Sequence, residues 1–176
     1  MFELFRFKDA VAAFTRKMRG MEDECRFRSD VLLEIRDASG KLKHKSFQKN
    51  LRTTVGVAYW EQQLFGTGSP SATALANYIA LTNTVAFTPA IGDTTLSGEQ
   101  TTNGLARAGA LTPTTANPAV FTHTFTYTGS SAVTLTGCGL FTASTSGTLV
   151  LETAFASSGT VSTSGDTITV TWTITY

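Results

Sequence analysis

The chain has 176 residues, a net charge of +1, 41% hydrophobic residues and 15% charged residues. This length suits one domain with a real core, or one domain with an appendage. The totals exclude a strongly basic or acidic protein, and no apolar run approaches the roughly 18 residues of a membrane span. Charged residues interrupt the N-terminal stretch too often for a secretory signal peptide.

The charges are unevenly distributed. Residues 1–61 hold 13 of the 14 Lys and Arg residues and nine of the 13 Asp and Glu residues. Residues 62–176 hold four acids and one basic residue, Arg107. A surface of Thr, Ser, Gly, Ala and Asn is unusual for a cytosolic enzyme, and it indicates faces that partners cover or a protein that works outside a cell. The break near Trp60 therefore predicts a change of architecture.

Residues 1–28 predict an N-terminal helical arm. Its apolar positions are Phe2, Leu4, Phe5, Phe7, Val11, Phe14 and Met18. The last four follow the 4-3-4 spacing of a helix face, and Gly20 suits a helix end. Three interpretations stay open: the arm packs back on its own domain, docks into a neighbouring subunit, or lies on a membrane surface.

Residues 30–49 predict a β-hairpin, in which the apolar run 31–35 is followed by turn residues and a lysine-rich return strand. Lys41, Lys43 and Lys45 alternate with other residues and therefore share one face. They indicate either a patch for nucleic acid or an acidic partner, or an edge strand on which lysines discourage unwanted pairing. We favour the edge strand, because no aromatic stacking platform is expected beside the lysines.

A second helix is expected over about residues 52–65. Val55 and Tyr59 suit its inner face, and Thr53 or Thr54 suits its N-cap, because a threonine hydroxyl accepts a hydrogen bond from the first turn. The Gly-Thr-Gly-Ser-Pro run that follows is a strong stop signal.

The rest of the chain predicts short strands separated by turns at about 8–12-residue spacing. The expected strands cover residues 78–81, 105–111, 121–128, 133–135 with 139–141, 148–155 and 168–176. The last of these alternates large apolar residues with threonine, which gives it one apolar face and one hydroxyl face. Residues 82–104 have no period and predict a long loop of the kind that is functional or contacts a partner.

These patterns predict a mainly β fold, an antiparallel β-sandwich of jelly-roll-like type with a helical arm, a hairpin and one additional helix. We divide the chain into an arm of residues 1–28 and a sandwich domain of residues 29–176.

Residues suited to catalysis are scarce. His44 lies in the hairpin and His123 on an aromatic strand face, and Cys25 and Cys138 are expected to be free thiols. No carboxylate pair is spaced as in a glycosidase, no serine lies in a nucleophile elbow, and no glycine-rich phosphate loop occurs. We expect a non-enzyme without catalytic, cofactor-binding or metal-ligating residues.

Two aspartates follow glycines in expected turns, Asp93 and Asp166. Their oxygens suit a calcium ligand, but the acidic spacing of a calcium loop is not repeated around them. We therefore interpret both as turn residues, whose carboxylates accept hydrogen bonds from nearby backbone N–H groups.

Several short motifs follow one another between about residue 30 and residue 176. The first group is Asp30-Val-Leu-Leu-Glu-Ile-Arg-Asp-Ala-Ser-Gly40, Lys49-Asn-Leu51, Gly56 and Leu-Phe-Gly66. The second group is Asn77-Tyr-Ile-Ala-Leu81, Pro89-Ala-Ile-Gly-Asp-Thr-Thr-Leu96 and Glu99. The third group is Gly139-Leu-Phe-Thr-Ala143, Gly147-Thr-Leu149 and Ser164-Gly-Asp-Thr-Ile-Thr-Val-Thr-Trp172. In order and spacing they resemble structural proteins of tailed bacteriophages.

The resemblance implies a β-sandwich module of the virion, either a tail, fibre or baseplate part or a capsid-decorating protein. We expect a non-enzymatic structural component, located in the virion, that assembles as a homo-oligomer, a trimer. Its other partners would be the major capsid protein or tail proteins, without nucleic acid or membrane. The predicted interface residues are Phe2, Phe5, Phe7, Val11, Phe14, Met18 and Phe87.

The main alternative is a carbohydrate- or receptor-binding β-sandwich used for host attachment. Such a module needs exposed aromatic side chains near polar ones, and Tyr78, Phe87 and Tyr127 are its candidates.

Overall fold

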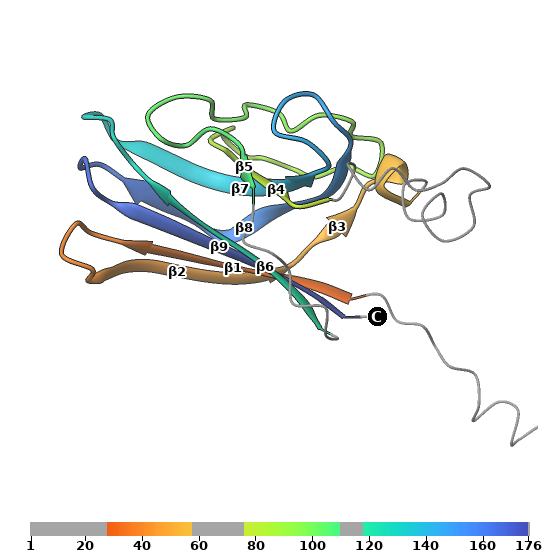
Figure 1. Cartoon of the computed structure of the whole chain (residues 1–176), viewed down its shortest axis with the longest axis horizontal. Helices are drawn as coiled ribbons and strands as arrows, with labels where there is room; N and C mark the ends of the chain where they lie inside the picture. The colour runs from red at the N-terminus through yellow and green to blue at the C-terminus, as the bar shows by residue number, and fades with distance from the viewer. Residues whose placement is uncertain (1–27, 58–75, 110–117, 176) are drawn as a thin grey trace, which may run out of the picture.

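A computed structural model describes residues 28–57, 76–109 and 118–175 of the chain. These residues form two antiparallel β-sheets that lie face to face, with loops gathered over one of them (Figure 1). The mainly β class is therefore confirmed. The predicted arm, apart from Arg28, and the predicted second helix beyond Val57 lie outside the described residues.

Sheet A has the strand order β2-β1-β9-β6. Its strands are β1 (Arg28–Arg36), β2 (Leu42–Lys49), β6 (Ala119–Thr126) and β9 (Thr167–Thr175). The predicted hairpin is confirmed as β1 and β2, and the Thr-alternating segment is confirmed as β9, which pairs with β1 on one side and β6 on the other. The predicted edge position of the lysine-rich strand is also confirmed, because β2 ends the order of sheet A.

Sheet B has the order β3-β8-β7-β4-β5. Its strands are β3 (Leu51–Arg52), β4 (Tyr78–Thr82), β5 (Ala108–Gly109), β7 (Val133–Phe141) and β8 (Leu149–Val161). The expected strand over 105–111 is too long, since only β5 pairs within its described part. The expected end of β8 at residue 155 is too early, because Gly159 pairs with Leu135 inside the strand.

The main core lies between the sheets and follows from alternation along their strands. Sheet A contributes Val31, Leu33, Ile35, Phe125, Ile168, Val170, Trp172 and Ile174. Sheet B contributes Ile79, Leu81, Leu135, Cys138, Leu140, Val150, Leu151, Phe155 and Val161. Complete burial of a side chain such as Leu33 stabilises the fold by about 2 kcal/mol. Because β9 directs its apolar face into this core, its threonine-rich face lies on the outside of the sheet.

A second core lies on the opposite face of sheet B. Residues 83–107, which connect β4 to β5, contribute Phe87 and Leu96, which pack against Ala80, Phe141 and Leu149. A Cβ atom added to Gly137 would lie 2.4 Å from Phe87 Cδ1, so only glycine allows this ring to approach β7. The predicted long loop is therefore an ordered third layer over sheet B.

The chain passes from sheet A to sheet B between β2 and β3, and a helical turn begins directly afterwards at Thr54. Thr53 Oγ1 accepts a 3.0 Å hydrogen bond from the backbone N–H of Gly56. The carbonyl of Thr53 accepts a second 3.0 Å bond from Val57 N. Thr53 is thus the N-cap, as one of the two sequence candidates predicted.

Candidate assembly surface

The outer face of sheet A carries two adjacent columns of threonines. Residues on β6 and β9 provide Thr122, Thr124, Thr126, Thr167, Thr169, Thr171 and Thr173. The side-chain oxygens of Thr122 and Thr171 lie 3.2 Å apart, and those of Thr124 and Thr169 lie 2.9 Å apart. Each pair uses one hydroxyl proton and leaves further hydrogen-bonding capacity for a partner.

The other half of this face, on β1 and β2, holds charges that pair within the chain. Lys45 Nζ lies 3.1 Å from Glu34, Arg36 lies 3.6 Å from the same carboxylate, and Arg28 lies 3.0 Å from Asp30. The hydrogen bond from Lys45, more than any other contact, holds the pKa of Glu34 below its ordinary value. Exposed pairs of this kind contribute little stability, but they leave the threonine half uncharged.

Phe47 lies on the charged half with 58% of its surface exposed, opposite Leu32 of β1. By alternation along β2 it shares a face with Lys45 and Lys49. The sequence-based expectation that no aromatic ring lies beside the lysines is therefore wrong. Strand alternation places Phe47 there because its position has the same parity as theirs.

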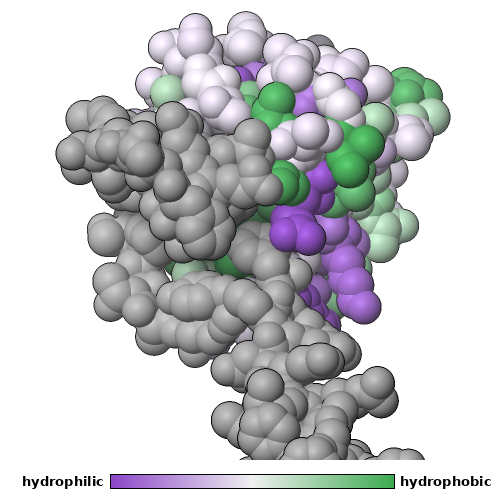
Figure 2. Space-filling view, turned by 90° about the vertical axis from the view of Figure 1, so that its right-hand side faces the viewer, coloured by the Kyte–Doolittle hydropathy of each residue, from purple (hydrophilic) through white to green (hydrophobic). Residues whose placement is uncertain are grey.

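The change of surface chemistry along the chain is visible at the end of the molecule where β3 lies (Figure 2). The surface at the top of this view is mostly pale, and strongly hydrophilic residues gather below it. Residues 83–107 contain only three charged side chains, Asp93, Glu99 and Arg107. The charges of the described chain are therefore concentrated on the hairpin side. The predicted change of architecture near Trp60 is wrong for the described residues, because β1 from the charged half pairs with β9 from the uncharged half in one sheet.

Hydrogen bonds just beyond β6 reveal which way its backbone groups point. The N–H of Tyr127 donates to Asp166 O at 2.8 Å, toward the side of β9. The N–H of the next residue, Thr128, donates to Asn103 O at 3.0 Å, on the opposite side. Because successive residues of an antiparallel strand point alternately to its two sides, even-numbered residues of β6 direct their backbone groups away from β9.

This alternation leaves part of β6 with open backbone groups. No described residue bonds the N–H or C=O groups that Val120, Thr122 and Thr124 direct away from β9. Thr126 differs, because its carbonyl faces Gly104, where an added Cβ would lie 2.0 Å from the oxygen. We call residues 120–124 the open edge of sheet A.

The opposite edge strand of sheet A, β2, contacts sheet B. The second half of β8 lies along β2, and the two strands are joined through side chains of β2. Ser157 N donates to Ser46 Oγ at 3.1 Å, Ala156 N donates to Gln48 Oε1 at 3.2 Å, and His44 Nε2 lies 2.9 Å from Ser157 O. His44 therefore has a structural place in this seam between the sheets.

Arg107 holds the third layer to sheet B. Its guanidinium makes a two-pronged ion pair with Glu99, through Nε at 2.9 Å and Nη2 at 2.6 Å. Nη1 donates to the carbonyls of Ala143 and Ser146, and the group lies 3.4 Å from the ring centroid of Phe141. With 9% of its side chain exposed, the single basic residue of positions 62–176 is a clamp between three segments.

Glu152 lies beneath the same layer on β8 and is fully buried. The N–H of Ala90 donates both to Glu152 Oε1, at 3.1 Å, and to Asp93 Oδ2, at 2.9 Å, so the two carboxyl groups are close. Burial, followed by the neighbouring Asp93, raises the pKa of Glu152 to about 8. Glu152 is therefore protonated at neutral pH, and the acid pair fastens residues 90–93 to the sheet.

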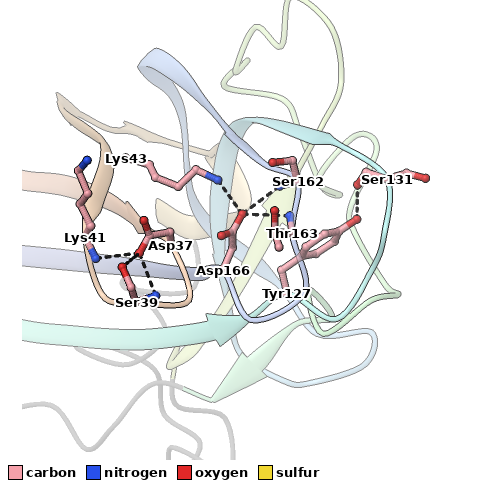
Figure 3. A network of polar contacts seen from close by, with 9 residues as sticks. All are labelled: Asp37, Ser39, Lys41, Lys43, Tyr127, Ser131, Ser162, Thr163 and Asp166. Atoms are coloured by element: carbon pink, nitrogen blue, oxygen red, sulfur yellow. Dashed lines mark hydrogen bonds and ion pairs between the residues drawn. The ribbon is translucent and has the colours of Figure 1, made fainter.

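Asp166 organises the turn between β8 and β9 (Figure 3). Its Oδ2 accepts hydrogen bonds from Lys43 Nζ at 2.8 Å, Ser162 N at 3.0 Å and Thr163 N at 3.2 Å. Burial alone would raise the pKa of Asp166, but these bonds outweigh it and hold the pKa below its ordinary value. In the β1–β2 turn, Asp37 accepts bonds from Ser39 and Lys41 in the same way. The predicted turn chemistry is confirmed for Asp166.

The remaining histidine and cysteine of the described chain, His123 and Cys138, pack within the fold. His123 Nδ1 lies 2.8 Å from Gly109 O, and its ring is 4.5 Å from that of Phe125. Burial raises the pKa of the Cys138 thiol well above its ordinary value, while Cys25 lies outside the described residues. Within ranges 28–57, 76–109 and 118–175, no group of three or more potential metal ligands occurs. No helix in these ranges is long and apolar enough to cross a membrane.

Six of the seven predicted interface residues, Phe2 to Met18, lie outside the described residues. Phe87 is described and is 9% exposed, because its ring packs in the second core. Of the other aromatic residues named for a binding module, Tyr127 is buried with its hydroxyl donating to Ser131 O (Figure 3), and Tyr78 is half-buried.

A scan against known protein families found no match, and a search of curated proteins found none either. Support for a function therefore comes from the surface of the described chain and from the resemblance of its motifs. Sequence reasoning missed the open edge. The uncharged Thr-alternating run 119–126 is its only signal in the sequence, and its edge position depends on strand order.

Proposed function

We propose that this protein is a non-enzymatic structural component of a tailed-bacteriophage virion, either a capsid-decorating protein or a tail or baseplate part. In this role it assembles as a homo-oligomer. One observation carries the proposal: at Val120, Thr122 and Thr124, sheet A presents outward backbone groups that no described residue bonds, with uncharged threonine columns beside them. Such a surface suits permanent contacts, in which charged residues are depleted.

The finer description of the fold belongs to the same proposal. Two sheets that share one core support an antiparallel β-sandwich of jelly-roll-like type. The arm of residues 1–28 would act as a clasp on an adjacent subunit, since it enters directly at β1. Deleting residues 1–20 is expected to leave a folded domain that no longer assembles on the particle, whereas a truncated protein that assembles normally would disprove the clasp.

Direct detection in particles tests the virion role. The protein is expected among the proteins of purified particles by quantitative mass spectrometry, at a copy number set by the symmetry of the head or the tail. Immunogold labelling then locates it on one of these two parts. Absence from particles whose known structural proteins are all detected would disprove the role.

The mass in solution tests self-assembly separately. Light scattering behind a sizing column is expected to give a multiple of the 18.8 kDa chain mass. Three chains would support the trimer expected from the sequence and contradict the two-chain contact that we derive below, whereas two chains would support that contact. A single-chain mass up to the highest soluble concentration would contradict homo-oligomerisation.

One observation favours a second candidate, a receptor-binding module: the exposed ring of Phe47 shares a face with Lys45 and Lys49. Aromatic rings beside polar groups are common in carbohydrate sites. A glycan array would then give hits that Phe47→Ala removes and that the control Val85→Ala, at another exposed apolar residue, keeps. An array without hits would count against this candidate.

A further inference from the structure

We propose that two copies of this chain join edge to edge through the open edge of β6, so that their A sheets form one continuous sheet across a two-fold axis at Thr122. The inference rests on the homo-oligomeric part of the proposed function and names the contact that produces it.

The open edge has the properties of a strand that is ready to pair. Val120, Thr122 and Thr124 each present an N–H and a C=O that no described residue bonds. The strand lacks the usual protections of an edge. Its sequence from Ala119 to Thr126 contains no charged residue and no proline, and its pairing with β9 shows no register shift.

The geometry selects one register. Paired residues of an antiparallel ladder that bond each other exchange two hydrogen bonds. With Thr122 opposite Thr122 of the second copy, Val120 faces Thr124 on both sides of the axis, which gives roughly six hydrogen bonds. A slip toward the end of the strand would require the carbonyl of Thr126, which Gly104 covers.

Side chains match across this register on both faces of the joined sheet. On the inner face, Phe121 of each copy lies opposite His123 of the other, which forms an aromatic cross-strand pair. On the outer face, Val120 lies opposite Thr124, and the two Thr122 hydroxyls meet at the axis. None of these paired residues is Lys, Arg, Asp or Glu, and each His123 faces a phenylalanine, so no like charges oppose each other.

The other edge strands of the two sheets are less suited to pairing with the open edge of β6, which is why we infer that its partner is the same edge of a second copy. The edge strand β2 carries Lys43, Lys45 and Lys49, and lysines on an edge strand discourage pairing. The edge strands of sheet B, β3 and β5, have two residues each, which is too short for a stable ladder. Among the described edge strands, only β6 of a second copy is both free of charged residues and as long as the open edge.

Charge swaps at the axis provide the test, because residue 122 opposes itself only in this contact. In light scattering of the full chain, the wild type is expected at twice the chain mass. Thr122→Lys and Thr122→Glu, each alone, place like charges opposite each other and are expected to weaken dimerisation about 100-fold. An equal mixture of the two is expected to restore the two-chain mass.

Thr171→Lys is the matched control. It removes the same 3.2 Å contact between the side chains of Thr122 and Thr171, but β9 is an interior strand, so its dimer is expected to persist. A second variant, Thr122→Pro, removes the outward N–H together with the Thr122 hydroxyl and is also expected to weaken dimerisation. Circular dichroism verifies that each variant is folded.

Three outcomes would overturn the inference: a monomeric wild type, an oligomer that Thr122→Lys leaves intact, or equal disruption by Thr171→Lys. An oligomer that resists the Thr122 variants would still support self-assembly through another surface. A protein that is absent from particles but dimerises through Thr122 would overturn the virion role alone.

Discussion

The outer faces of the two sheets differ in what covers them. Sheet B is covered by residues 83–107, which bring their own small core, the Arg107 clamp and the Glu152–Asp93 acid pair. Sheet A carries ion pairs on one half and threonine columns on the other, and its open edge has no described partner. The comparison shows that this chain uses an irregular segment to complete one sheet internally, and we infer that a second copy completes the other.

The largest expected effect is on the covered sheet. Arg107→Ala leaves Glu99 and the carbonyls of Ala143 and Ser146 without their donor, and we expect a loss of about 3–4 kcal/mol in the free energy of unfolding. Arg107→Lys keeps the charge but not the two-pronged geometry, so it should lose about half as much. Urea denaturation measures both values. A loss below that of an ordinary surface substitution would show that the clamp is not needed.

Removing the ring that anchors the layer should be almost as costly. Phe87→Ala creates a cavity in the second core, with an expected destabilisation of about 3 kcal/mol. The matched control is Val85→Ala, two positions away and 89% exposed, which should change stability by less than about 0.5 kcal/mol. Similar effects of the two variants in thermal unfolding would contradict an ordered cover over sheet B.

The acid pair makes the stability of the covered sheet depend on pH. Unfolded Glu152 loses its proton near its ordinary pKa of 4.5, whereas folded Glu152 keeps it until about pH 8. Protonated Glu152 therefore stabilises the fold fully below pH 4.5, and this contribution falls as the pH rises through 8.

Glu152→Gln keeps an acceptor for Ala90 without the charge, so it should flatten this pH dependence. At pH 9 we expect it to be about 2 kcal/mol more stable than the wild type. Urea unfolding at pH 5, 7 and 9 measures the difference. Parallel curves for the two proteins would show that Glu152 ionises normally.

The smallest effect is expected on the uncovered sheet. Thr169→Val removes the 2.9 Å contact with Thr124 but keeps a β-branched side chain, so the monomer should change in stability by less than about 0.5 kcal/mol. Thermal unfolding of the dissociated protein tests this value. A loss above about 2 kcal/mol would mean that the threonine columns stabilise the chain itself.

The sequence was most informative where a period is strong. Alternation identified β9, because a half-buried strand must place apolar residues at every second position. Turn residues identified the β1–β2 hairpin and the turn at Asp166. The strand predicted at 105–111 is too long, since only Ala108 and Gly109 pair as β5 in its described part. Leu105 is buried and Arg107 bonds loop carbonyls although neither residue belongs to a strand. Gly159 looked like a turn residue, although it lies within β8 beside the ring of His44.

The candidate surface was only partly predictable. The uncharged alternation of residues 119–126 was visible, but strand order is set by contacts between segments far apart in the chain. The Thr128–Asn103 bond, which reveals the open side of β6, is one such contact. The raised pKa of Glu152 likewise depends on residues 90–93 folding back over β8. No local pattern in the sequence predicts this contact.

The lysine-rich edge strand β2 has a consequence for growth. A sheet with two free edges can add chains without limit and produce filaments. Here β2 carries lysines at one flank, which discourage strand addition there. With the open edge of β6 paired as we propose, we expect assembly through sheet A to stop at two chains, and a larger particle to grow through a different surface.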